Sequence, residues 1–205
     1  MATAVLDYQK KQLTAGEVEK IAKDLSNDTS TGTVNLSQNS IDAERAILIA
    51  NALRTNTTLH TLLLTTNKIG DEGARAFAEL LKTNTTLTDL DLDHNEITDV
   101  GFIALGEMVS ANSTLTTLKL QVNYLGNEGA AVFSKALEAN TTLTTCYTMS
   151  LKQWESSTDK ALLGKCMRYP PQAEVDEAAF ANQFELFKDQ SKPVAHASDV
   201  MQVGA

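Results

Sequence analysis

Three aspartates at alternate positions, Asp89, Asp91 and Asp93, form a compact group of side chains that can do chemistry. Alternate residues of a β-strand point to the same side, so a strand here places the three carboxylates on one face, about 7 Å apart. Such a group attracts a basic segment of a protein partner or, with six or more oxygen ligands, holds a divalent cation. The simplest alternative is a solvated acidic surface, because exposed carboxylates interact weakly in water. We favour the protein partner and expect no metal site.

The remaining reactive side chains form no recognisable catalytic group. His60, His94 and His196 have no second ligand at metal spacing, and the sequence contains no phosphate-binding glycine loop or nucleophile elbow. Cys146 and Cys166 lack the spacing of a metal site and are too few for a disulfide scaffold, which predicts reduced thiols. We therefore expect a protein that is not an enzyme and has neither a cofactor nor a small-molecule substrate.

The charge of the chain narrows the class of partner. Lys and Arg number 17 against 26 Asp and Glu, which gives a formal net charge of -9. Most of such a surface repels nucleic acid and anionic membranes, so we expect neither as a partner. No signal peptide is visible between Met1 and Lys11, and no apolar stretch has the length of a membrane helix. We expect a cytoplasmic protein.

A 28-residue repeat determines the elements that must position these side chains. Three series share this spacing: Leu59, Leu87, Leu115 and Leu143; Asn67, Asn95 and Asn123; and Gly73, Gly101 and Gly129. Full units begin at Thr57, Thr85 and Ser113, a weaker unit begins at Thr29, and a partial unit runs from Thr141 to Met149. The chain is therefore predicted to be a solenoid of stacked repeats.

Each unit changes its hydrophobic period halfway. Leu90 and Leu92 alternate as in a strand, whereas Phe102, Leu105 and Val109 recur at helical spacing. Stacking such units aligns the strands in a parallel sheet on the concave side and the helices on the convex side. Cys146 then replaces a core leucine and should be buried and inert.

The polar residues that recur at the ends of the strands and helices are expected to have structural roles. The asparagines after the strands (Asn67, Asn95, Asn123) should satisfy buried backbone groups. Those after the helices (Asn56, Asn84, Asn112, Asn140) should end them in the left-handed conformation. Asp71, Glu72 and Glu128 begin helices, where their charge suits the helix dipole and needs no other purpose.

The pattern LxxLxLxxNxI with this period resembles the ribonuclease-inhibitor-like class of leucine-rich repeat proteins. That resemblance implies an α/β fold, a right-handed horseshoe arc with a parallel concave sheet and convex helices. The Asn-Thr-Thr-Leu joints and the closing strand followed by a helix are similar to the repeat domain of tropomodulins, which cap actin filaments. The repeat type is also similar to that of the Ran GTPase activators. We expect a non-enzymatic adaptor that binds a protein partner; the alternatives are a tropomodulin-like actin or cytoskeletal regulator and a GTPase-regulator-like scaffold.

The repeat register predicts which side chains share the concave face. The central ladder is Asn35, Leu63, Asp91, Lys119 and Tyr147, with Thr33, Thr61, Asp89, Thr117 and Thr145 on one side and Ser37, Thr65, Asp93, Gln121 and Met149 on the other. Lys119 is expected beside Asp91, and Leu63 and Tyr147 favour an interface because apolar and aromatic residues anchor partners. The predicted partner-binding residues are Leu63, Asp89, Asp91, Asp93, Lys119 and Tyr147.

The repeat boundaries divide the chain into four regions. Residues 1–28 are predicted to be an N-terminal capping helix segment, with a capping box between Thr14 and Glu17. Residues 29–149 hold four repeats and a partial fifth, and residues 150–169 form a C-terminal helical cap. Residues 170–205 are an amphipathic helix and a flexible tail. The helix carries Phe180, Phe184 and Phe187, and either folds back on the solenoid or docks in a groove of a partner.

Overall fold

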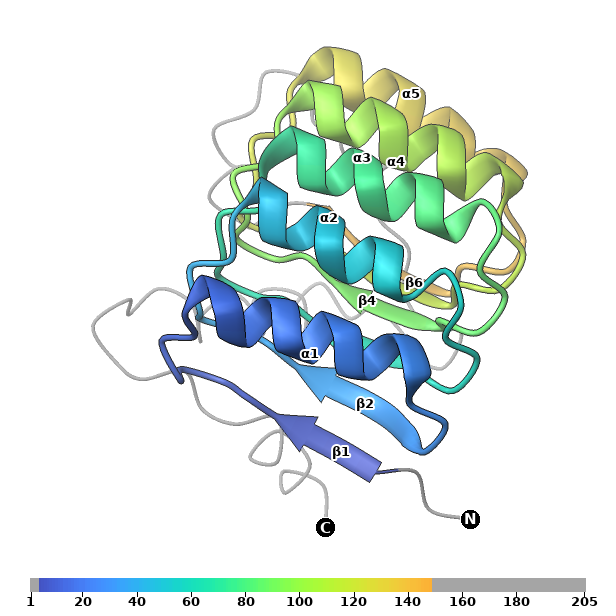
Figure 1. Cartoon of the computed structure of the whole chain (residues 1–205). Helices are drawn as coiled ribbons and strands as arrows, with labels where there is room; N and C mark the ends of the chain where they lie inside the picture. Colours follow the sequence, from blue (N-terminus) through green and yellow to red (C-terminus); the bar gives the residue numbers. More distant parts are fainter. Residues whose placement is uncertain (1–3, 149–205) are drawn as a thin grey trace, which may run out of the picture. The chain divides into compact units, whose positions relative to one another are not determined.

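The computed structural model describes residues 4–148, in which strands and helices alternate along the chain (Figure 1). The elements are β1 (Ala4–Asp7), α1 (Ala15–Asn27), β2 (Thr31–Asn35), α2 (Ala43–Ala52), β3 (Thr61–Leu63), α3 (Gly70–Leu81), β4 (Asp89–Asp91), α4 (Asp99–Ala111), β5 (Thr117–Lys119), α5 (Asn127–Ala139) and β6 (Thr145–Tyr147). The expected C-terminal cap at 150–169, and the helix with Phe180, Phe184 and Phe187, lie outside the described residues.

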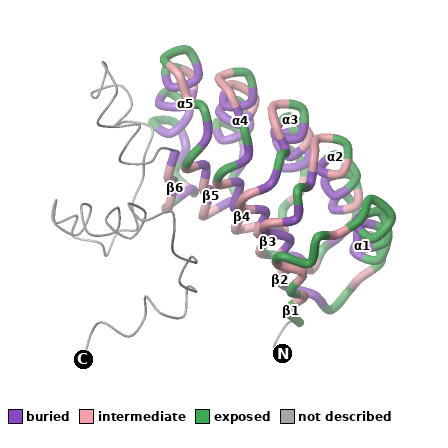
Figure 2. Tube along the Cα trace, turned by 90° about the vertical axis from the view of Figure 1, so that its left-hand side faces the viewer, coloured by how far each residue is buried: buried purple, intermediate pink, exposed green. Residues whose placement is uncertain are grey.

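The strands form one parallel sheet in chain order, from β1 to β6. Each register step equals one repeat: Leu62 pairs with Leu90, and Leu90 pairs with Leu118. Figure 2 shows the strands stacked in one layer and the helices in a second layer, more widely spaced than the strands. This arrangement makes the sheet concave and the helices convex, and it confirms the predicted α/β leucine-rich repeat solenoid.

The core lies between the two layers. Leucines at alternate strand positions, such as Leu90 and Leu92, are buried, and Cys146 continues their series at 0% exposure, as expected. Phe102 and Phe133, one from each of two neighbouring helices, meet edge to face with ring centroids 5.9 Å apart. Aromatic edge-to-face pairs stabilise a core beyond the area they bury.

The N-terminal region differs from the expectation of a capping helix alone. The capping box of Thr14 and Glu17 begins α1 as predicted. However, β1 precedes that helix and pairs with β2, with Leu6 opposite Val34. The first repeat therefore begins near residue 4, not at residue 29. This unit was missed because its strand carries few of the leucines that mark the other units.

The start of α1 carries a charged residue where the later helices α3, α4 and α5 have glycine. A Cβ added to Gly73 would meet Ala46 of the preceding helix, so this position faces the previous repeat. The equivalent position in α1 is Glu17, whose carboxylate instead accepts a hydrogen bond from the backbone N–H of Thr14 at 2.8 Å.

One asparagine ladder binds consecutive repeats at the ends of the strands, as predicted. Asn67 Nδ2 donates to the carbonyls of Leu36 (3.1 Å) and Leu64 (2.9 Å), while its Oδ1 accepts from the backbone N–H groups of Asn39 (3.0 Å) and Ile41 (2.9 Å). Asn123 makes the same contacts one ladder position further on. Its Nδ2 donates to carbonyls at the ends of two neighbouring strands, and its Oδ1 accepts hydrogen bonds from backbone N–H groups of the preceding repeat. The ladder therefore joins each repeat to its neighbour through buried amides.

The expectation for the asparagines that follow the helices was wrong in its mechanism. Asn112 and Asn140 have φ of -78° and -82° with extended ψ, so they do not adopt the left-handed conformation. Instead, Asn112 Nδ2 donates to the carbonyl of Leu81, 31 residues earlier, and its Oδ1 accepts from the N–H of Leu115. The side chain thus caps the helix of the previous repeat and shapes its own turn.

Asp71 also does more than complement the dipole of its helix. Its Oδ1 accepts hydrogen bonds from the N–H groups of Thr98 (2.8 Å) and Gly101 (3.0 Å), and its Oδ2 accepts from Thr98 Oγ1 (2.7 Å). These groups belong to the start of α4, one repeat further on. The carboxylate therefore caps the next helix, and the prediction that it has no other purpose was wrong.

Candidate functional site

The concave face brings the predicted site residues into neighbouring strands. The central ladder follows the expected order of Asn35, Leu63, Asp91, Lys119 and Tyr147. Asp89 lies two positions before Asp91 in β4, between Thr61 and Thr117. Asp93 follows the end of β4, where the strand ends of neighbouring repeats remain hydrogen bonded. The register on which the site depends is therefore correct.

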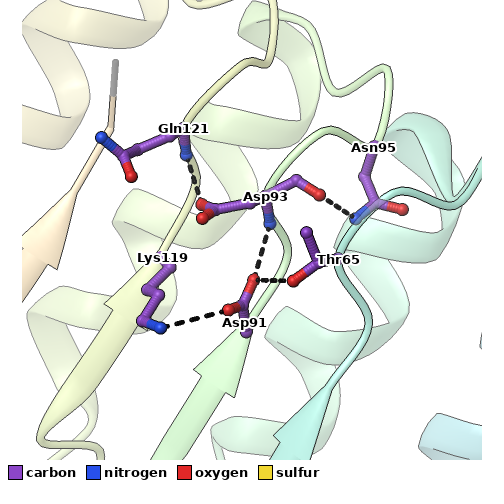
Figure 3. A network of polar contacts seen from close by, with 6 residues as sticks. All are labelled: Thr65, Asp91, Asp93, Asn95, Lys119 and Gln121. Carbon is purple, nitrogen blue, oxygen red and sulfur yellow. Dashed lines mark hydrogen bonds and ion pairs between the residues drawn. The ribbon is translucent and has the colours of Figure 1, made fainter. Parts of the chain in front are cut away.

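Asp91 is less exposed than expected. Its side chain is 9% exposed and forms an ion pair with Lys119 across β4 and β5, with Nζ 3.3 Å from Oδ2 (Figure 3). Its Oδ1 accepts hydrogen bonds from Thr65 Oγ1 at 2.8 Å and from the backbone N–H of Asp93 at 3.1 Å. The alternative of a solvated acidic surface does not describe Asp91, whose carboxylate contacts residues of three consecutive repeats.

Asp93 lies beside Asp91 in the same network (Figure 3). Its Oδ1 accepts a hydrogen bond from the backbone N–H of Gln121 at 2.6 Å. Burial, followed by the charge of Asp91, raises the pKa of Asp93 well above its usual range, although Gln121 and Lys119 oppose that shift. The residue keeps part of its surface exposed, yet its carboxyl group is costly to ionise.

Lys119 is the cation that balances this pair of acids. Burial alone lowers the pKa of Lys119, but the negative charges of Asp91 and Asp93 outweigh it and raise the pKa above its ordinary value. Burial raises the pKa of the neighbouring Tyr147. Lys119 therefore stays charged at neutral pH.

On the concave face, Asp89 and Leu63 are partly exposed, whereas Asp91 is buried. Asp89 Oδ2 accepts a hydrogen bond from Thr88 Oγ1 at 2.7 Å and forms no ion pair with a basic residue within residues 4–148. In that same stretch, His, Cys, Asp and Glu form no group of three suited to a metal ion. None of the described helices is long and apolar enough to cross a bilayer.

A second surface was not predicted from the sequence. Val100, Val122 and Tyr124 are 43%, 42% and 65% exposed and lie where the strands of the last repeats turn into helices. We call these three residues the edge patch. Comparing equivalent positions of the repeats would have revealed it, because Val100 stands where the other units have glutamate.

The stacked repeats and the polar concave sheet define a leucine-rich repeat domain for protein interaction. The family model of the TMOD/LMOD leucine-rich domain matches residues 16–163, and the chain belongs to this tropomodulin and leiomodin family. The family resemblance that the repeat joints indicated is thereby confirmed.

Two solved structures are similar to the chain. One is described as leiomodin-1 actin-binding site 2; it is 26% identical, with a TM-score of 0.57, and the match covers 85% of this chain and 96% of that one. The other is the C-terminal domain of a tropomodulin from Caenorhabditis elegans, 12% identical, with a TM-score of 0.55 and coverage of 67% and 84%; it supports the fold alone. No curated protein matches the chain.

Proposed function

We propose that the chain is a protein-interaction domain whose partner is actin and that it acts in the cytoplasm by binding, not by catalysis. The observation that supports this partner is family membership over residues 16–163, together with a likeness that spans 96% of the leiomodin-1 actin-binding structure. The family likeness favours an actin regulator over a GTPase-regulator-like scaffold.

We propose that the concave face contributes to the contact. Leu63 supplies an apolar anchor on the central ladder, and Tyr147 supplies an aromatic one on β6, where the described part of that ladder ends. Asp89 supplies a partly exposed carboxylate that a basic segment of actin would neutralise. Asp91, Asp93 and Lys119 then act mainly by holding the strands that present these side chains.

Actin binding is tested with the full chain by filament co-sedimentation and by elongation of pyrene-labelled actin. We expect saturable co-sedimentation or a concentration-dependent change in the elongation rate. A chain that stays in the supernatant, fails to bind monomeric actin and leaves elongation unchanged would refute the proposed partner.

The concave face is tested by Leu63→Ser combined with Asp89→Lys, which leaves Asp91 and Lys119 themselves unchanged. We expect this variant to weaken actin binding by about tenfold, because one apolar anchor is lost and one charge is reversed. Arg75→Glu is the matched control, since Arg75 is an exposed residue of α3. Equal binding by both variants and the wild type would remove the concave face from the proposal and leave actin as the partner.

A further inference from the structure

The edge patch is apolar at positions where the fold accepts polar residues. The residues equivalent to Val100 in other units are Glu44, Glu72 and Glu128; those equivalent to Val122 are Gln38, Thr66 and His94; those equivalent to Tyr124 are Ser40, Lys68 and Glu96. The same backbone position therefore carries a polar side chain in each of these other units. Packing of the repeat does not require these three apolar residues.

The three residues lie on adjoining turns of two consecutive repeats. Tyr124 forms a parallel bridge with Thr98, and its N–H donates to the carbonyl of Ile97 at 2.7 Å. Thr98 is the N-cap of α4, whose second residue is Val100. The N–H of His94 donates to the carbonyl of Gln121 at 2.8 Å, which sets Val122 beside His94. The edge patch thus adjoins the concave face at the end of β5.

Val122 is held in a conformation that disfavours it. Its φ is 56°, in the left-handed region, which a β-branched side chain rarely adopts. The equivalent residues Gln38, Thr66 and His94 share this conformation, so it belongs to the repeat. Valine is therefore a costly choice at a position where the repeat imposes this backbone conformation and polar residues also fit.

The charges in the two segments that carry the edge patch are all negative. Residues 94–101 and 122–128 contain Glu96, Asp99 and Glu128 and no Lys or Arg. A second copy of this acidic chain would be repelled there. The complementary partner surface presents an apolar side chain flanked by lysine or arginine.

We propose that the edge patch is a second actin-contacting surface, which takes an apolar side chain of an actin subunit flanked by basic residues. This inference rests on the proposed function and deepens it. The edge patch adjoins the concave face at Gln121 and Val122.

The test is a polar replacement of the edge patch, Val100→Gln, Val122→Gln and Tyr124→Ser, measured by actin co-sedimentation and by anisotropy with monomeric actin. We expect the dissociation constant to rise at least about tenfold, since exposed aromatic and apolar anchors carry much of a binding energy. The matched control is Ile47→Gln with Leu48→Gln, which replaces two apolar residues of α2, each 37% exposed, and should leave binding unchanged.

A single substitution separates binding from folding. Asn tolerates the left-handed region better than valine, so Val122→Asn should raise the melting temperature while it weakens actin binding. Loss of binding in a more stable protein cannot result from unfolding. Glu96→Lys with Glu128→Lys should also weaken binding, and more so at low salt, by repelling the basic residues of the partner.

The outcomes distinguish the two proposals. If the wild type does not bind actin, the proposed function and this inference both fail. If the wild type binds and the edge-patch and Val122→Asn variants bind equally well, the edge patch is not a contact surface, and the proposed function stands. Weaker binding by both variants, with the α2 control unchanged, supports the inference.

Discussion

Lys119 Nζ lies 3.3 Å from Asp91 Oδ2, and the two residues come from neighbouring strands of consecutive repeats. Only Asp91 is nearly buried, since 39% of the Lys119 side chain remains exposed. The pair is therefore asymmetric: loss of the lysine leaves a buried charge, whereas loss of the aspartate leaves a lysine that water can solvate.

This asymmetry predicts that Lys119→Met lowers the free energy of unfolding by about 2 kcal/mol, because Asp91 loses its countercharge. Adding Asp91→Asn should restore at least half of that loss, since Asn can still accept hydrogen bonds from Thr65 and Asp93. Chemical denaturation measures both values. Lys82→Met, at an exposed ion pair with Glu79, is the control and should leave stability unchanged. No recovery in the double variant would contradict the argument.

Asp93 predicts a dependence of stability on pH. Burial and the charge of Asp91 raise its pKa in the folded state above the unfolded value, so the folded protein holds this proton more tightly. The stability contributed by Asp93 is complete below the unfolded pKa of about 3.9 and is lost as the pH rises through the folded pKa. Asn at position 93 mimics the protonated acid. Asp93→Asn should therefore have the same free energy of unfolding as the wild type below the unfolded pKa, and a higher one as the pH rises. Unfolding free energies across this range test the sign, and a constant difference would contradict it.

Two ladder asparagines differ in the number of hydrogen bonds they make. Asn67 uses both side-chain atoms, whereas Asn95 donates through Nδ2 and its buried Oδ1 has no hydrogen-bond partner among the described residues. Asn67→Ala should therefore destabilise the protein by about 1–2 kcal/mol more than Asn95→Ala, since it leaves additional buried N–H groups without an acceptor. Parallel thermal and urea unfolding of the two variants checks this order; equal losses would contradict it.

Replacing glycine by alanine is expected to have opposite effects on stability at two positions, Gly101 and Gly16. A Cβ at Gly101 would come within 2.5 Å of Ile97 Cγ2 and 2.8 Å of Asp71 Oδ1, whereas nothing lies within 4 Å of a Cβ at Gly16. Gly101→Ala should cost about 1–3 kcal/mol by overpacking the joint between repeats. Gly16→Ala should stabilise α1 by about 0.5–1 kcal/mol through helix propensity. Calorimetry distinguishes the two signs, and destabilisation by Gly16→Ala would refute the second.

The strand register could be predicted because the 28-residue repeat and the alternation of leucines within each strand agree at many positions. Leu62, Leu90 and Leu118 align in the sheet as expected. The pattern did not reveal the first repeat, because Lys11 stands where the next unit has Asn39, and leucine is sparse before residue 13. A degenerate terminal unit is recognised only when its strand pairs with the next one.

Exposure within the concave face was harder to predict than register. Alternation places Asp91 on the same face as Asp89, but it does not show that Thr65, Lys119 and the N–H of Asp93 enclose its carboxylate. The backbone conformation of Asn112 was predicted wrongly for a similar reason. Its partner, the carbonyl of Leu81, lies 31 residues away, beyond the reach of local sequence rules.

The asparagines after the helices all bond backwards along the chain. Asn56, Asn84, Asn112 and Asn140 donate to the carbonyls of Leu25, Leu53, Leu81 and Val109, each 31 residues earlier. On a ribosome, the end of each helix must therefore wait for the following unit to emerge before this carbonyl meets its amide donor. The repeats are therefore completed in order from the N-terminal end during synthesis. A chain released early leaves the terminal carbonyl of its last helix without the asparagine donor.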